Sequence, residues 1–200
     1  MLTQVYNKRD AEKITSEITH IINPTKKIKD LEKQLEFSES YQNRVNLADA
    51  HLANKDYKSA LPLYLRALQD GSENDFYVNS KLVETYFLAE NYSETVLHAE
   101  KIKDKLEYKK SKTQFICGLA HEKLGDFELA EHNLRQIDIR YSFYDERLIL
   151  AEFLMSRNKK EDAKTILEDI KNESQHITRT NQKLYRGTVA QVEKLLAQLD

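Results

Sequence analysis

The chain of 200 residues is 40 % hydrophobic and 32 % charged, and it contains only 4 Gly and 2 Pro. So few turn-forming residues leave little room for a β-sandwich or barrel, and the abundant Leu, Glu, Lys and Ala favour helices, so we expect an all-α protein. The 31 basic and 33 acidic side chains give a net charge of −2, which provides no long-range attraction for nucleic acid or anionic lipid.

The start of the chain, Met1 to Lys8, has no apolar core of signal-peptide length. No stretch approaches the ~18 consecutive apolar residues of a membrane-spanning helix. Cys117 is the only cysteine, which excludes an internal disulfide framework and suits a reducing compartment. We therefore expect a cytoplasmic protein with no direct membrane insertion, and an anchor further upstream is left open.

Residues 1–40 are predicted to form an N-terminal helical segment. Their polar, helix-favouring sequence is interrupted at Asn23-Pro24, which ends one helix and suits the first turn of the next. We expect helices over Lys8–Ile22 and Pro24–Phe37. The second helix is expected to cover the open side of the following helices with its apolar face, Ile28, Leu31 and Leu35. Its lysines are interpreted as a solvated face: Lys26, Lys27, Lys29 and Lys33.

Residues 41–177 contain four copies of one pattern, at 41–74, 76–109, 111–143 and 144–177. The first landmark of each copy advances by 35, 35 and 33 residues, through Leu47, Leu82, Cys117 and Leu150. At one fixed distance after this landmark, the second helix of each copy carries a small residue: Ala60, Thr95, Ala130 and Ala163. Small residues let two antiparallel helices approach closely, so each copy is predicted to be a helix hairpin that stacks on the next.

Residues 178–200 are predicted to form a C-terminal capping helix from Thr178 to Leu199, with Thr178 or Thr180 as its N-cap. Its apolar residues recur at helical spacing: Leu184, Val189, Val192, Leu195, Leu196 and Leu199. Capping of the last hairpin is the simpler interpretation. Self-association of two chains through the remaining apolar face is left open as the alternative.

The third copy, with Gly118, Gly125-Asp126-Phe127 and Ala130, resembles the tetratricopeptide repeat (TPR) family. The copies depart from the family pattern where it often has Trp, at Arg44, Asn79, Gln114 and Arg147. They also lack the closing Pro, and the fourth copy has Lys160 in place of an aromatic residue. The resemblance implies an all-α, right-handed α-solenoid of about four TPR-like hairpins with extra helices at both ends.

No catalytic or cofactor-binding motif is found, so we expect a protein that is not an enzyme and binds no cofactor. Cys117 and His121 have a spacing that metal ligands use, but other copies fill these positions with Leu and Tyr. We therefore interpret them as packing residues and predict no metal site.

The family geometry places the first helix of each hairpin along a concave groove. Acidic residues outnumber basic ones at the inward positions, and Tyr77, Phe87 and Phe115 add aromatic surface. The resemblance therefore implies a scaffold for a protein or peptide with an apolar segment and basic flanks. The candidate partner-binding residues are Asp49, Tyr77, Glu84, Phe87, Lys112, Phe115, Leu119, Glu122 and Glu152.

The family's clamp for chaperone C-terminal carboxylates is not expected here. Of the five matching positions only Lys112 agrees with that clamp, and the others are Val45, Asp49, Lys81 and Ile116. A second hypothesis is a structural subunit of a larger, membrane-tethered assembly that makes its contacts through the terminal helices. RNA binding, a third hypothesis, would show a steep salt dependence that we do not expect.

Overall fold

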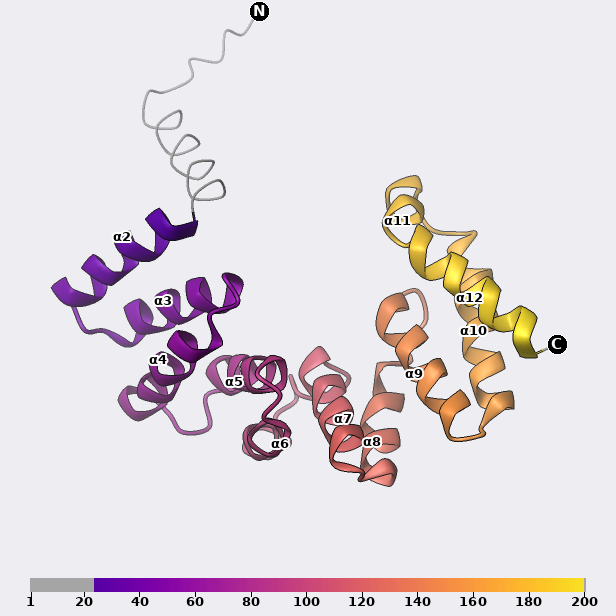
Figure 1. Ribbon diagram of the computed structural model, residues 1–200, viewed down its shortest axis with the longest axis horizontal. Coiled ribbons are helices and arrows are strands. Elements are labelled where there is room, and N and C mark those ends of the chain that lie inside the picture. Colours follow the sequence, from indigo (N-terminus) through magenta and orange to yellow (C-terminus); the bar gives the residue numbers. More distant parts are fainter. Residues whose placement is uncertain (1–23, 200) are drawn as a thin grey trace, which may run out of the picture. The chain divides into compact units, whose positions relative to one another are not determined.

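The computed structural model describes residues 24–199, and within that range it contains eleven α-helices, one short 3₁₀ helix and no strand (Figure 1). The chain divides into two compact units, which are described separately: unit 1 ends at Glu90 and unit 2 begins at Asn91. The helix expected over Lys8–Ile22 lies outside the described residues. None of the described helices is both long and apolar enough to span a membrane.

Unit 1 contains four helices, α2 (Pro24–Phe37), α3 (Tyr41–Ala53), α4 (Tyr57–Asp70) and α5 (Phe76–Leu88). Three of them begin at side chains that accept a hydrogen bond from a backbone N–H of the first turn, Ser40, Asp56 and Asp75. The predicted helix over Pro24–Phe37 is confirmed, and it packs against α3. The Asn43 amide also donates to the backbone carbonyls of Gln34 and Ser38, which fixes the end of α2 on α3.

The core of unit 1 lies among α3, α4 and α5. Ala48 and Ala60, the small residues expected at the closest approach of the first hairpin, are fully buried. Larger side chains fill the space beside them, among them Val45, Leu52, Tyr64, Leu68, Val78 and Leu82. The alternation of small and large residues in the sequence therefore sets how α3 and α4 pack.

Unit 2 contains α6 (Tyr92–Glu100), α7 (Lys112–Leu124), α8 (Phe127–Leu134), η1 (Arg135–Ile137), α9 (Tyr144–Ser156), α10 (Lys160–Ser174), α11 (Arg179–Leu184) and α12 (Arg186–Leu199). A Cβ added at Gly118 on α7 would lie 2.9 Å from the Leu134 side chain, so glycine is required for the contact between α7 and α8. The main core is formed by α7, α8, η1, α9, α10 and α12, including Leu150, Ala163 and Leu167.

The four turns between the paired helices repeat one backbone geometry. Lys55, Glu90, Gly125 and Asn158 all have a positive φ, at 61°, 59°, 85° and 61°. Their spacing of 35, 35 and 33 residues equals that of the sequence repeat. Each second helix begins two residues later, at Tyr57, Tyr92, Phe127 and Lys160. The turn predicted at Gly125-Asp126 is therefore confirmed, and three other residues adopt the same left-handed conformation without being glycine.

The four polar residues that replace Trp of the TPR pattern are all buried. Each ties its helix to the loop that precedes it: Arg44 donates to Glu39, the Asn79 amide to the carbonyls of Glu73 and Asp75, and Arg147 to Asp138, while Gln114 accepts from the N–H of Lys110. These positions are thus filled by hydrogen-bonding side chains that fix the start of each first helix.

Two segments of unit 2 differ from the expected helices. Helix α6 ends at Glu100, and residues 101–110 form consecutive turns that still bury Ile102 and Tyr108. The prediction of a single C-terminal helix from Thr178 to Leu199 is wrong, because the helix is interrupted at Tyr185 and forms two helices, α11 and α12. Thr178 is the N-cap of α11, as predicted. Helix α12 buries Val192, Leu195 and Leu196 in the core.

Candidate functional site

A hollow of about 400 Å³ lies in unit 1 beside α3 and α5, and we refer to it as the α3–α5 hollow. It is lined by Asp49, Leu52, Ala53, Lys55, Tyr57, Lys81, Glu84 and Leu88. Charged groups of both signs therefore share it with apolar side chains. Of the partner-binding residues predicted from the sequence, Asp49 and Glu84 line this hollow directly.

The carboxylate of Asp49 is held in place by two tyrosines. The Tyr64 hydroxyl donates to Oδ1 at 2.5 Å, and the Tyr77 hydroxyl donates to Oδ2 at 2.7 Å. Burial, with the hydrogen bond to Asp49, raises the pKa of Tyr77 to about 12, and the pKa of Tyr64 is raised for the same reasons. Both phenols therefore stay protonated and remain donors at neutral pH, which fixes the orientation of Asp49.

The basic residues of the hollow change its expected charge. Lys81 forms an ion pair with Glu84 at 3.0 Å, and its ammonium lies 5.9 Å from the centre of the Tyr77 ring. Lys55 lines the same hollow. The sequence predicted an acidic groove, but in this hollow two lysines balance the charges of Asp49 and Glu84. The prediction missed them because Lys55, in the α3–α4 turn, and Lys81 were not among the inward positions of the predicted groove.

Helix α5 carries two further predicted residues that differ in exposure. Tyr77 is 47 % exposed and so combines a fixed hydroxyl with an accessible ring. Phe87 is half-buried. Of the predicted residues, Asp49 and Glu84 therefore line the α3–α5 hollow, and Tyr77 is joined to it through its hydrogen bond to Asp49.

The predicted residues of unit 2 do not form a comparable cluster. Lys112 forms an ion pair with Glu146 at 2.7 Å, which joins α7 to α9. Leu119 and Glu122 are half-buried, and Glu152 is exposed. Phe115 is only 4 % exposed and lies in the core, so the prediction that its ring lines a groove is not supported.

The side chains of Cys117 and His121 are both buried, as expected for residues that pack between helices. Burial raises the pKa of the Cys117 thiol, and its side chain is 1 % exposed. The nearest carboxylate to His121 Nδ1 is that of Asp126, at 3.5 Å. Across residues 24–199 there is no group of three or more His, Cys, Asp or Glu side chains placed to hold a metal ion.

Sequence reasoning did not find a second surface, at the turn between α7 and α8. The Arg157 guanidinium lies 3.8 Å from the centre of the Phe127 ring, beside a hollow of about 490 Å³. Phe127 and Leu129 are exposed there. Arg157 follows α9, so only the folded structure brings it to Phe127, and no local signal in the sequence predicts the contact.

Comparison with known proteins identifies the fold but no family. No protein family profile matches the chain, and no curated protein matches it. One solved structure that does match, described as "MamA MSR-1 C2", has a TM-score of 0.63 and 16 % sequence identity, and the match covers 85 % of this chain and 99 % of that chain. MamA is a TPR-containing protein.

At this level of identity the match shows the fold alone. Together with the helices of residues 24–199, it shows that the chain has a TPR-like helical repeat fold. The predicted fold class, an all-α solenoid of TPR-like helix pairs, is confirmed.

Proposed function

We propose that the chain is a protein-interaction scaffold whose α3–α5 hollow binds a short peptide segment of a partner. The observation that carries this proposal is the fixed Asp49 carboxylate, which two tyrosines orient beside the apolar side chains of Leu52 and Leu88. A site whose polar groups are already ordered loses little conformational entropy on binding. The TPR-like fold supports the proposal because stacked helix pairs leave extended surfaces for other proteins.

The peptide that suits this hollow has an apolar side chain next to a basic one. Leu52 and the 45 % exposed Leu88 provide the apolar contact. Asp49 and Glu84 provide carboxylates for a Lys or Arg of the peptide. Lys55 and Lys81 add sites for an acidic residue, so the charge pattern of the peptide is expected to matter more than its net charge.

A peptide array probed with the labelled full-length chain tests this proposal. The array would contain apolar segments flanked by Lys or Arg, and the same segments flanked by Glu. The variant Glu84→Lys with Leu88→Asp reverses one charge and removes the apolar contact, so we expect it to lose binding to the basic-flanked set. The matched control is Glu36→Lys with Leu65→Asp, which makes the same changes at exposed residues of α2 and α4 outside the hollow. Equal binding by both variants would place the peptide site elsewhere.

A structural role through the terminal helices is the second candidate. It is favoured by the exposure of Phe37 at the end of α2 and of Leu184 on α11, both of which leave large apolar side chains in water. Deleting residues 1–37 distinguishes the two candidates. A scaffold that binds through the α3–α5 hollow should keep its partner after this deletion, whereas an assembly subunit that uses α2 should lose it.

A further inference from the structure

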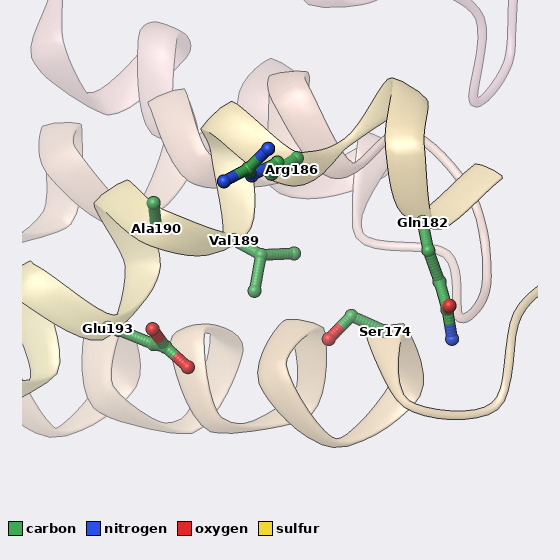
Figure 2. A pocket seen from close by; sticks show the side chains of 6 residues that line it. All are labelled: Ser174, Gln182, Arg186, Val189, Ala190 and Glu193. Carbon is green, nitrogen blue, oxygen red and sulfur yellow. The ribbon is translucent and has the colours of Figure 1, made fainter. Parts of the chain in front are cut away.

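A second hollow, of about 310 Å³, lies in unit 2 at the C-terminal helices. Four of its lining residues belong to α12, Arg186, Val189, Ala190 and Glu193, and the others are Ser174 on α10 and Gln182 on α11. Figure 2 shows Val189 between Arg186 and Glu193, with Ser174 and Gln182 on the other side of the hollow. We call the four residues of α12 the α12 face.

The charges of the α12 face have no partner within the described part of the chain. Arg186 and Glu193 are both exposed, and neither forms an ion pair with another described residue. A Cβ added at Gly187, next to Arg186, would meet no atom within 4 Å. Helix α12 buries Val192, Leu195 and Leu196 in the core, and Val189 is half-buried on that side of the helix, whereas Arg186, Ala190 and Glu193 are exposed.

The spacing of the two charges makes the face complementary to itself. Arg186 and Glu193 are seven residues apart, which is nearly two helical turns, so both lie on one face about 10 Å apart along the axis. A second copy of α12 that runs antiparallel, related by a two-fold axis near Val189 and Ala190, brings its Glu193 to Arg186 and its Arg186 to Glu193. A two-fold interface satisfies both pairs at once.

From this geometry we propose that the α12 face binds a second copy of the chain, so that two copies form an antiparallel α12 pair. The exposed Ala190 side chains of both copies meet at the axis, with the half-buried Val189 at the edge of the contact, and the two Arg186–Glu193 pairs set the register. Because α12 begins at Arg186, only residues 186–193 of the two helices lie opposite one another, so the contact is about 12 Å long. One helix pair of this length buries less than the ~1,200 Å² of a stable complex, so the dimer is weak and depends on concentration.

Sedimentation velocity of the full-length chain, from micromolar to millimolar concentration, tests the proposal. The wild-type chain should form dimers as concentration rises. Arg186→Glu alone and Glu193→Arg alone each turn both ion pairs into like-charge contacts, so each should weaken association by about tenfold. An equimolar mixture of the two variants should restore the dimer, because both contacts then join a carboxylate of one chain to a guanidinium of the other. The double variant, with Arg186→Glu and Glu193→Arg in one chain, should restore it as well.

The matched control is Lys194→Glu, which makes the same charge change as Arg186→Glu on the same helix, roughly a quarter turn from Glu193. It should associate like the wild-type chain, and circular dichroism should show unchanged helix content in every variant. A wild-type chain that stays monomeric at millimolar concentration overturns the proposal, and so does a mixture that associates no better than its components. Both results are independent of the α3–α5 hollow, which lies in unit 1.

Discussion

Arg44 in unit 1 and Arg147 in unit 2 occupy the same position of the repeat, yet their surroundings differ. Each guanidinium donates to a carboxylate 26 residues further along the chain, Arg44 to Asp70 at 2.5 Å and Arg147 to Glu173 at 2.8 Å. The side chains of Arg147 and Glu173 are 0 % and 1 % exposed. The side chain of Asp70 is 27 % exposed, and Glu39, the second partner of Arg44, is 73 % exposed.

The buried Glu173 carboxylate also accepts more hydrogen bonds than the Asp70 carboxylate, although Nη2 of Arg147 is buried without a hydrogen-bond partner. Glu173 accepts from the backbone N–H of Tyr141 at 2.6 Å and lies 3.4 Å from Arg140 Nε, while Arg147 also donates to Asp138. Water screens charges near the surface, but it does so far less in a protein interior. The same sequence position therefore has a different energetic weight in the two units, and burial rather than residue type sets that weight.

The largest expected effect is that of Arg147→Met. It leaves the Glu173 carboxylate buried without its main partner, so the free energy of unfolding should fall by about 3–5 kcal/mol. Urea unfolding of the full-length chain measures this loss of free energy, and hydrogen exchange reports whether it affects α9 and α10. Replacing both partners, with Arg147→Met and Glu173→Met, should recover most of the loss. A loss of less than about 1 kcal/mol for the single variant would contradict a role for burial.

Acidification should weaken the buried pair through Glu173. Burial opposes ionisation of this side chain, but the hydrogen bonds from Arg147 and Tyr141 outweigh it and hold its pKa below the ordinary value of 4.5. The carboxylate therefore stabilises the fold fully above pH 4.5, and this stabilisation is lost as the pH falls through the lowered pKa. Hydrogen exchange in α9 and α10, followed from about pH 6 to about pH 3, should show this loss. The variant Glu173→Gln should be less stable than the wild-type chain at neutral pH and should lack this part of the pH dependence. If its stability falls with decreasing pH as steeply as that of the wild-type chain, other groups cause the pH dependence.

The smallest expected effect is that of Arg44→Met. Its partners Glu39 and Asp70 can be solvated when the guanidinium is removed, so the change in unfolding free energy should be small beside that of Arg147→Met. The salt dependence of unfolding provides a second measurement. Added salt should reduce the difference in unfolding free energy between the wild-type chain and Arg44→Met, but it should leave the loss caused by Arg147→Met nearly unchanged. Equal losses for the two arginine variants would remove the distinction between the units.

Much of the fold could be predicted because the repeat has a local cause. Small residues such as Ala60, Ala130 and Ala163 recur at the position where two helices touch, and the structure buries all three completely. The helix over Pro24–Phe37 also follows from local signals, since proline suits the first turn of a helix. These features depend on residues that are close in the chain, which is why sequence spacing is sufficient to find them.

The candidate site was harder to predict because it depends on which side of a helix its neighbours cover. Phe115 has the spacing of a groove residue, but the packing of unit 2 places it in the core. Asp49 and Tyr77 were both selected, but the hydrogen bond between them joins residues 28 positions apart. The Trp replacements at Arg44 and Arg147 were treated as departures from a pattern. Their carboxylate partners stand at one fixed separation, which is a signal that the sequence does contain.

The left-handed turns of the repeat have a consequence for engineering the protein. Lys55, Glu90 and Asn158 adopt a conformation that glycine adopts without steric cost, and Gly125 at the equivalent turn shows that the geometry accepts glycine. For residues with a Cβ this conformation costs on the order of 1 kcal/mol, with Asn the least penalised. Glu90→Gly and Asn158→Gly alter no packed side chain of either core and would therefore give a more heat-resistant scaffold, whereas Lys55 lines the α3–α5 hollow and is kept so that the binding surface is unchanged.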